Sequence, residues 1–169
     1  FIQSSVAHYI LDYAIEPQKR DWLPRMASGE LVGAIAITEP GAGSDVKGIR
    51  TTARRFGDHY IINGSKTFVT NGWHAGLVCL AVKTDPNAQP RHKGMSLFIA
   101  PKTKGFTVGR KLQKLGYKAI DTAELFFEDY RVPESHLIGG VEGQGFYQAT
   151  GGLELGRINV AARGVGIAE

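Results

Sequence analysis

The stretch Thr38-Glu39-Pro40-Gly41-Ala42-Gly43-Ser44-Asp45 ends a short apolar segment, residues 33–38, and carries no bulky side chain after its Glu-Pro turn. Glycines this close together let the backbone approach a ligand, because they have no Cβ atom. Their amide groups and the Ser44 hydroxyl can cradle a phosphate or the polar edge of a ring. A tight surface turn is the alternative, since glycine-rich loops are common. Taken alone, the octet predicts either a ligand-binding strand end or such a turn.

A second patterned segment follows, Ile61-Ile62-Asn63-Gly64-Ser65-Lys66-Thr67-Phe68-Val69-Thr70-Asn71-Gly72. Asn63-Gly64 between β-prone runs predicts a hairpin turn. In the strand that follows, alternation places Phe68 and Thr70 on one face. It places Thr67 and Val69 on the other. An aromatic ring beside a hydroxyl suits contact with a flat heterocycle, and an aromatic side chain in a β core is the alternative.

Together with residues 126–133, FFEDYRVP, these segments resemble the acyl-CoA dehydrogenase family in order and spacing. The likeness extends over essentially the whole chain. It implies a flavoprotein that uses FAD to desaturate an acyl-CoA thioester between its α and β carbons and passes electrons to an electron-transfer flavoprotein. Alternatives in the same superfamily are an acyl-CoA oxidase or a flavin monooxygenase. A non-catalytic acyl-CoA or flavin binder is an alternative from another class.

The resemblance also implies which residues contact the cofactor. Those lining the isoalloxazine would be Ile35, Ala36, Ile37 and Thr38, with Thr38 at its pyrimidine edge. The phosphates of the flavin or of acyl-CoA, or its pantetheine, would pass beside Gly41, Gly43 and Ser44. Glu39 would support the turn and add polarity at the ring edge. On the other side of the ring would lie Phe68, Val69 and Thr70, the last with its hydroxyl near N5. Phe68 stands where many members have tryptophan.

The same resemblance implies that substrate contacts come from Ser44, Leu153, Glu154, Gly156 and Arg157. Arg157 could equally form a structural ion pair. We expect the catalytic base beyond Glu169, because Gly156 occupies the position where a few members carry a glutamate base, and glycine cannot abstract a proton. Glu154 points away from that position, since two helical residues rotate a side chain by roughly 200°. The chain alone is therefore expected to lack a catalytic residue and to be inactive.

Hydrophobic periodicity predicts how the chain is organised. A helical stripe covers residues 4–14 (Val6, Ala7, Ile10, Leu11 and Ala14), and a second short helix follows Glu16-Pro17 with Trp22, Leu23 and Met26 on one face. Six or seven short strands then span about a hundred residues. This pattern predicts a mainly β chain, an antiparallel barrel or sandwich flanked by short α-helical segments. A helical period returns from Phe146 onward.

On the family pattern, residues 1–30 correspond to the last helices of an N-terminal helical domain. Residues 31–140 correspond to the middle β domain, and residues 141–169 to the truncated first helix of a C-terminal helical domain. The resemblance implies a tetramer or dimer for the full-length protein.

The composition of the chain limits the kinds of partner that we expect it to bind. The chain has a net charge of +4, and between Lys102 and Lys118 it has basic residues and no acidic one. A solvated face explains this run best, attraction of CoA phosphates comes second, and nucleic-acid binding is not expected. Five scattered histidines predict no metal site, and Cys79 lies in an apolar run that predicts a buried strand. No apolar run has transmembrane length, so we expect a cytoplasmic location, or the mitochondrial matrix in a eukaryote.

Overall fold

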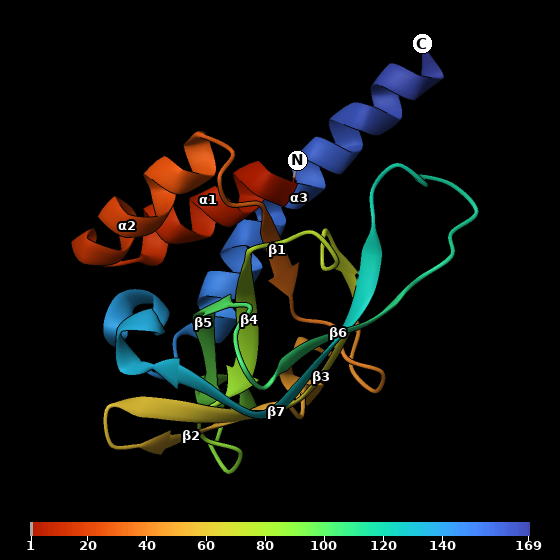
Figure 1. The fold of residues 1–169 in the computed structure, drawn as a ribbon. Coiled ribbons are helices and arrows are strands. Elements are labelled where there is room, and N and C mark those ends of the chain that lie inside the picture. Colours follow the sequence, from red (N-terminus) through yellow and green to blue (C-terminus); the bar gives the residue numbers. More distant parts are fainter. Residues whose placement is uncertain (1) are drawn as a thin grey trace.

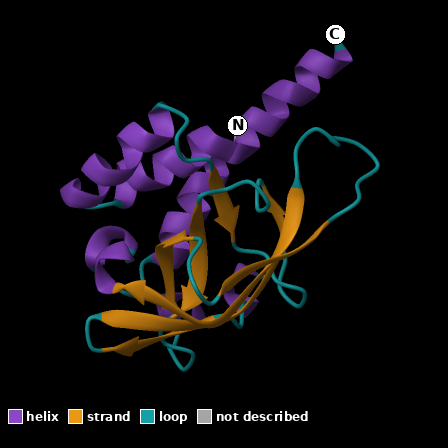
Figure 2. Cartoon of the chain, viewed as in Figure 1, coloured by secondary structure: helices purple, strands orange, loops and turns teal. Residues whose placement is uncertain are grey.

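The fold is a seven-stranded sheet that curls into a half-barrel and is covered on one side by helices (Figures 1 and 2). The computed structural model describes residues 2–169, apart from the side chain of Leu155. The helices are α1 (Ile2–Tyr13), α2 (Glu16–Ala27) and α3 (Gly145–Ala168). The strands are β1 (Gly33–Ala36), β2 (Thr52–Phe56), β3 (His59–Thr70), β4 (Leu77–Lys83), β5 (Met95–Pro101), β6 (Phe106–Lys111) and β7 (Thr122–Pro133). The predicted mainly β class is confirmed.

The strand order is β1-β4-β2-β3-β7-β6, and β5 pairs with β4 beside this path. Most pairs are antiparallel, as predicted. The pair β1–β4 is parallel, with Gly33 opposite Leu77, and a single parallel pair, Thr52 opposite Lys83, joins β2 to β4. The first strand is therefore placed against a strand from much later in the chain, which the local sequence pattern does not reveal.

Strand β4 separates two hydrophobic cores, and all of its residues are buried. One core lies between β4, β5 and the three helices and includes Val6, Ile10, Trp22, Cys79 and Ile99. The other fills the half-barrel and includes Tyr60, Val78, Leu80, Phe98 and Tyr130. A strand covered on both faces is a nearly continuous apolar run rather than an alternating one, and in β4 this run extends from Leu77 to Val82. The predicted burial of Cys79 follows from this position and is confirmed.

The two N-terminal helices match their prediction except at one position. Trp22 and Met26 of α2 are buried, as expected. Leu11 of α1 was expected in the apolar stripe but is 51% exposed. Tyr9 is buried instead, and its hydroxyl donates to the Ala149 carbonyl oxygen of α3 at 3.0 Å. The buried face of α1 is thus rotated toward Tyr9. Apolar periodicity does not select this residue, but its hydroxyl can be buried because it has a hydrogen-bond acceptor.

The hairpin predicted at Asn63-Gly64 is wrong. Strand β3 runs continuously through both residues, and the turn that reverses the chain lies between Phe56 and His59, where β2 and β3 end and begin. Asn63 instead meets Asp129, another turn-forming residue, across a register shift between β3 and β7. Its Oδ1 accepts from the Asp129 backbone amide at 2.9 Å, and its Nδ2 donates to the Asp129 carboxylate at 3.2 Å.

The register shift falls at Glu128-Asp129 of β7. Strand β7 is continuous there, and Asp129 has a φ of 45°. Two residues that each favour a turn thus face one another and form a β-bulge, because long-range strand pairing outweighs their local preference.

Gly64 lies in this bulge with a φ of 147°, where the backbone of Thr51 approaches closely. An added Cβ atom would lie 2.7 Å from the Thr51 Cα atom and 2.5 Å from its Oγ1. The position therefore accepts no side chain without displacement of Thr51, a neighbour of the Glu-Pro turn in space.

We expect Gly64→Ala to lower the free energy of unfolding by about 2 kcal/mol through this overpacking. Gly57→Ala is the matched control, because Gly57 also has a positive φ, 63°, but open space around its Cβ position. The control should lose only about 1 kcal/mol, the cost of a left-handed residue. Urea unfolding of both variants measures the difference, and equal losses would contradict the proposed crowding.

Candidate functional site

The glycine-rich octet forms a closed turn at the end of β1. The Glu39 amide donates to the Ala42 carbonyl oxygen at 3.0 Å, and the Ala42 amide donates to the Glu39 carbonyl oxygen at 3.1 Å. The Cβ positions of Gly41 and Gly43 face open space. The octet is therefore a tight turn at a strand end with an accessible backbone, and its binding of a ligand stays a prediction.

A buried ion pair lies beneath this turn. The Lys66 Nζ atom lies 2.8 Å from Glu39 Oε1, and the side chain of Lys66 is fully buried. The Thr51 hydroxyl donates to the same oxygen at 2.6 Å, as does the Thr51 amide at 3.0 Å. The Arg50 amide donates to Glu39 Oε2 at 2.6 Å. Both carboxylate oxygens are thus occupied by donors from three residues.

The surroundings move both pKa values of this pair. Burial raises the pKa of Glu39, but the Lys66 ammonium and the donated hydrogen bonds outweigh it, so the pKa lies below its ordinary value. For Lys66, burial lowers the pKa to about 8, and the Glu39 carboxylate opposes that shift. At neutral pH both groups are therefore charged, and the carboxylate is engaged as an acceptor.

Phe68 and Thr70 share a face at the end of β3, as predicted. Phe68 is 67% exposed with a φ of 57°, and Thr70 is half-buried. Thr67 and Val69 are buried on the opposite face, Val69 within the half-barrel core. A non-glycine residue with positive φ is strained, and such residues concentrate at binding sites. The alternative in which Phe68 fills the core does not hold.

Thr38 and Phe68 belong to segments that are bound to each other. The Thr67 amide donates to the Thr38 carbonyl oxygen at 2.9 Å, immediately before Phe68 in the chain. Of the apolar residues assigned to the same site, Ala36 and Ile37 are buried and Ile35 is half-buried. Their side chains belong to the cores, so the exposed part of this region consists of Thr38, the turn and Phe68.

Two residues that hold this region together were not predicted. Lys66 was not expected to be buried, because strict alternation with Thr67 places it on the opposite face. A register shift between Lys66 and Val69 brings both Lys66 and Thr67 inside. Asn71, the second, donates from Nδ2 to the Gly33 carbonyl oxygen at 3.2 Å and so ties the end of β3 to the start of β1.

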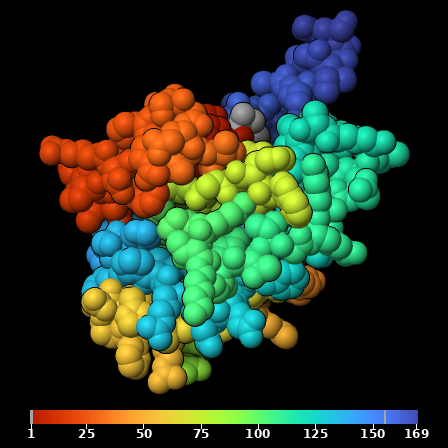
Figure 3. All heavy atoms as spheres, viewed as in Figure 1, coloured from red at the N-terminus to blue at the C-terminus, as the bar shows by residue number. Residues whose placement is uncertain are grey.

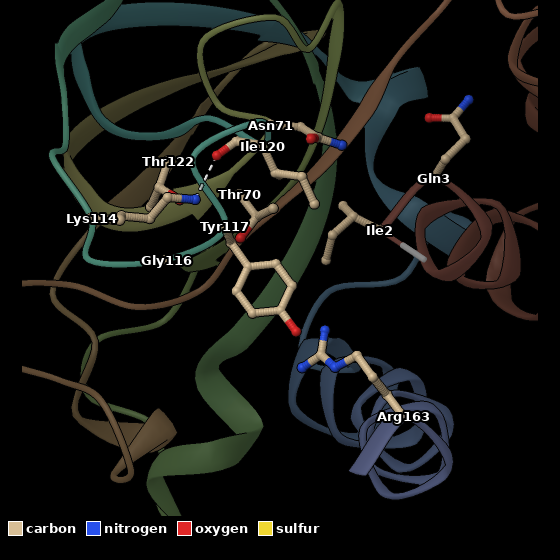
Figure 4. Close-up of a pocket in the computed structure, with 10 residues that line it drawn as sticks. All are labelled: Ile2, Gln3, Thr70, Asn71, Lys114, Gly116, Tyr117, Ile120, Thr122 and Arg163. Atoms are coloured by element: carbon tan, nitrogen blue, oxygen red, sulfur yellow. Dashed lines mark hydrogen bonds between the residues drawn. The ribbon is translucent and has the colours of Figure 1, made fainter. Parts of the chain in front are cut away.

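A cavity of about 530 Å³ opens beside Thr70 (Figure 4). It is lined by Ile2, Gln3, Thr70, Asn71, Lys114, Gly116, Tyr117, Ile120, Thr122 and Arg163. Arg163 of α3 and Tyr117 of the β6–β7 loop point toward each other, with the guanidinium carbon 4.9 Å from the ring centroid, a cation–π contact. Lys114 Nζ donates to the Ile120 carbonyl oxygen. A second cavity, about 260 Å³, adjoins Glu39, Gly41 and Thr51.

The candidate substrate residues on α3 do not line the cavity beside Thr70. Leu153, Glu154 and Arg157 are exposed and Gly156 is half-buried, and that cavity is lined instead by Arg163, six residues beyond Arg157. The end of α3 projects from the rest of the molecule (Figure 3), and its exposed apolar residues include Ile158, Val160, Val165 and Ile167. Arg163 was missed because a single arginine in a helical run carries no distinguishing pattern.

Two kinds of feature are absent among the residues that the structure describes. None of the helices is both long enough and apolar enough to cross a bilayer. Within residues 2–169, no three side chains of histidine, cysteine, aspartate or glutamate are grouped so that they could hold a metal ion.

Comparison with known proteins identifies what the chain is similar to. Residues 34–130 match the family model described as acyl-CoA dehydrogenase, middle domain. The chain is 47% identical to the long-chain specific acyl-CoA dehydrogenase of pig mitochondria, covering 97% of this chain and 38% of that protein. It is also 47% identical to an acyl-CoA dehydrogenase of Bacillus subtilis, over 95% of this chain and 42% of the relative. The chain thus spans about two fifths of the length of these relatives.

Solved structures agree with the sequence matches. The crystal structure of an acyl-CoA dehydrogenase from Geobacillus kaustophilus is 55% identical with a TM-score of 0.90, covering 92% of this chain and 41% of that one. Butyryl-CoA dehydrogenase from Megasphaera elsdenii is 40% identical with a TM-score of 0.92, covering 98% and 43%. A structure described as an electron transferring flavoprotein of Acidaminococcus fermentans is 44% identical with a TM-score of 0.91, covering 96% and 42%.

The lowered pKa of Glu39 makes stability depend on acidity. The carboxylate contributes fully above about pH 4.5, its ordinary pKa, and this contribution is lost as the pH falls through the lower value in the folded state. We therefore expect the free energy of unfolding to fall below that pH, and Glu39→Gln to reduce this slope. Urea unfolding across a pH series measures the effect. Glu134→Gln, in an exposed pair with Arg55, should leave the slope unchanged, and an equal change in both variants would contradict the assignment.

Proposed function

This chain belongs to the acyl-CoA dehydrogenase family, and we propose on that basis that it forms the flavin-binding part of an FAD-dependent acyl-CoA dehydrogenase. In this proposal residues 31–140 are the middle β domain, residues 1–30 end an N-terminal helical domain, and residues 141–169 begin a C-terminal helical domain. The observation that carries the proposal is Phe68, an aromatic side chain held exposed at a strained position beside the glycine-rich turn.

The residues present fit a flavin. A flat tricyclic ring needs an apolar contact on its face and hydrogen-bond partners at its edge. Phe68 offers the first and the hydroxyl groups of Thr38 and Thr70, both half-buried, offer the second. Gly41 and Gly43 leave room for the backbone to approach a phosphate, and Ser44 is exposed beside them. Val69 and Ala36 are buried, so their part would be to support the ring site from the core.

The chemistry divides between the cofactor and this chain. When bound, FAD supplies the acceptor for the hydride that leaves the β carbon of the acyl-CoA. Thr38 and Thr70 would orient the ring, and Phe68 would exclude water from its face. Ser44, with Leu153, Glu154, Gly156 and Arg157 of α3, would contact the substrate, with the α3 residues brought to it by neighbouring parts of the full-length protein.

Proton abstraction from the α carbon requires a base, and we propose that it lies beyond Glu169. Glu39 is unsuited to this role, because its carboxylate is buried and already accepts from Lys66, Thr51 and Arg50. Glu154 is exposed on α3 and lines neither of the two cavities described above. We therefore expect this chain alone to be inactive.

The proposal extends to partners. Acyl-CoA is the substrate, and an electron-transfer flavoprotein accepts the electrons. The similarity to the structure described as an electron transferring flavoprotein of Acidaminococcus fermentans supports this acceptor. The full-length protein would be a homo-oligomer, located in the cytoplasm or, as for the pig relative, in mitochondria. An oxidase or monooxygenase of the same superfamily would differ in its reaction with oxygen, and a non-catalytic binder would lack the base.

The decisive experiment follows the visible spectrum of the full-length protein under anaerobic conditions while acyl-CoAs of several chain lengths are added. We expect a bound flavin whose absorption bleaches with some chain lengths, because hydride transfer reduces the ring. A flavin that stays oxidised with every acyl-CoA would favour another superfamily reaction or a lost base. A protein without flavin would overturn the site assignment.

A second test concerns Phe68. Because its side chain is mostly exposed, Phe68→Ala should change the free energy of unfolding by no more than about 0.5 kcal/mol. It should nevertheless weaken FAD binding by the full-length protein about tenfold, as expected for loss of a stacked aromatic. Phe56→Ala is the matched control, since Phe56 is 61% exposed on the same sheet and pairs with His59 at the opposite end of β3 from Phe68. Equal FAD affinity in the two variants would contradict the role of Phe68.

A further inference from the structure

Resting on the proposed flavin site, we propose that Lys66 is a positioning residue that binds the end of β1 to β3 and thereby fixes the separation of Thr38 and Phe68. Lys66 itself is fully buried and does not reach the exposed face. It would act through the two segments that it joins, which carry the edge contact and the face contact of the ring. The Glu39 carboxylate would hold its ammonium in place.

The contacts of Lys66 bracket Thr38. Its Nζ atom donates to the Ile37 carbonyl oxygen at 3.1 Å and to Glu39 Oε1 at 2.8 Å. The residue between these two acceptors is Thr38, and its own carbonyl oxygen accepts from the Thr67 amide at 2.9 Å. Three consecutive residues after β1 are thus held by two consecutive residues of β3, and Phe68 follows directly.

These bonds replace strand pairing that the sheet does not provide here. Strand β1 pairs with β4 through Ala36, and among the residues that the structure describes its ladder includes none of β3. Residues 37–39 therefore lie beyond the last ladder pair, where the chain would otherwise be free to shift. The Lys66 ammonium, the Thr67 amide and the Asn71 amide bond to Gly33 connect this edge of β1 to β3. Among them, Lys66 provides the side-chain contacts to the two residues that flank Thr38.

Fold stability alone gives a weak reason for a charge at this position. Removing two charges from water is costly, and apolar residues of similar volume often stabilise a core as well or better. A buried lysine that donates to two fixed oxygen atoms instead specifies one geometry, because its donors must meet those acceptors. Here those acceptors are the backbone of the proposed site and the carboxylate beneath it. Fixing the residues after β1 relative to β3, rather than stabilising the fold, therefore accounts for the buried pair of Lys66 and Glu39.

Three variants of the full-length protein separate these roles. Lys66→Met removes the ammonium and leaves Glu39 as a buried charge without its cation. The double variant Glu39→Gln with Lys66→Met removes both charges, so it restores stability without restoring the bond to Ile37. The double variant Arg55→Met with Glu134→Gln removes an exposed ion pair, at 2.6 Å, on the same sheet and is the matched control.

Each variant is measured for its free energy of unfolding, for its FAD dissociation constant by reconstitution of the apoprotein, and for the visible circular dichroism of bound flavin. We expect Lys66→Met to be destabilised and the double variant at Glu39 and Lys66 to recover stability. Both should bind FAD about tenfold more weakly, with altered dichroism, as for loss of a hydrogen bond to a charged group. The control should match the wild type in all three measurements.

The inference is overturned if the Glu39 and Lys66 double variant binds FAD with wild-type affinity and dichroism, because the pair would then serve stability alone. Should Lys66→Met fail to fold, the double variant decides, since it leaves no unpaired buried charge. Failure of the proposed function is distinct, because the wild-type protein would then bind no flavin at all. If the wild-type protein binds FAD and the variants bind it with the same affinity and dichroism, only the positioning role of Lys66 is contradicted.

Discussion

The buried contact between Lys66 and Glu39 is the constraint on which the candidate site depends. A glycine-rich turn has little conformational preference of its own, since its residues allow many backbone angles. Here the carboxylate accepts from Lys66 of β3 and from Arg50 and Thr51 just before β2, and the ammonium donates to Ile37 just after β1. One ion pair therefore connects the residues after β1 to β3, two segments that the ladders of β1 do not join. The ion pair thus orders the glycine-rich turn from its buried side, while the outer surface of the turn stays exposed.

The central position of β4 explains how so small a sheet supports this arrangement. It carries β1 on one edge and β5 on the other, and its two faces belong to different cores. The helices bury one face, so the half-barrel is free to present its other elements outward. The exposed ring of Phe68 and the half-buried Thr70 occur at the end of β3, where Thr70 lines a cavity together with Ile2 of α1 and Arg163 of α3. The accessible side chains thus lie where the end of β3 meets the helices.

Sequence patterns predicted the β class, the strand-end turn and the shared face of Phe68 and Thr70, because each depends on local alternation or on a specific motif. They failed where a partner strand decides the outcome. Asn63-Gly64 favours a hairpin locally, yet pairing with β7 turns it into a bulge. The next register shift buries Lys66, which alternation assigns to the opposite face from Thr67. Such shifts depend on long-range pairing, which no short window contains.

The parallel pairing of β1 with β4 also bears on the order in which the molecule assembles. Gly33 must meet Leu77, and β3 must meet β7, across long intervening loops. The entropy of closing such loops is lost before the contacts that compensate it are made, so chains rich in distant contacts fold slowly. Thr38 and Phe68 come from segments that are far apart in the sequence, joined by the bond between Thr67 and Thr38. The site is therefore a product of tertiary structure and not of any one local segment.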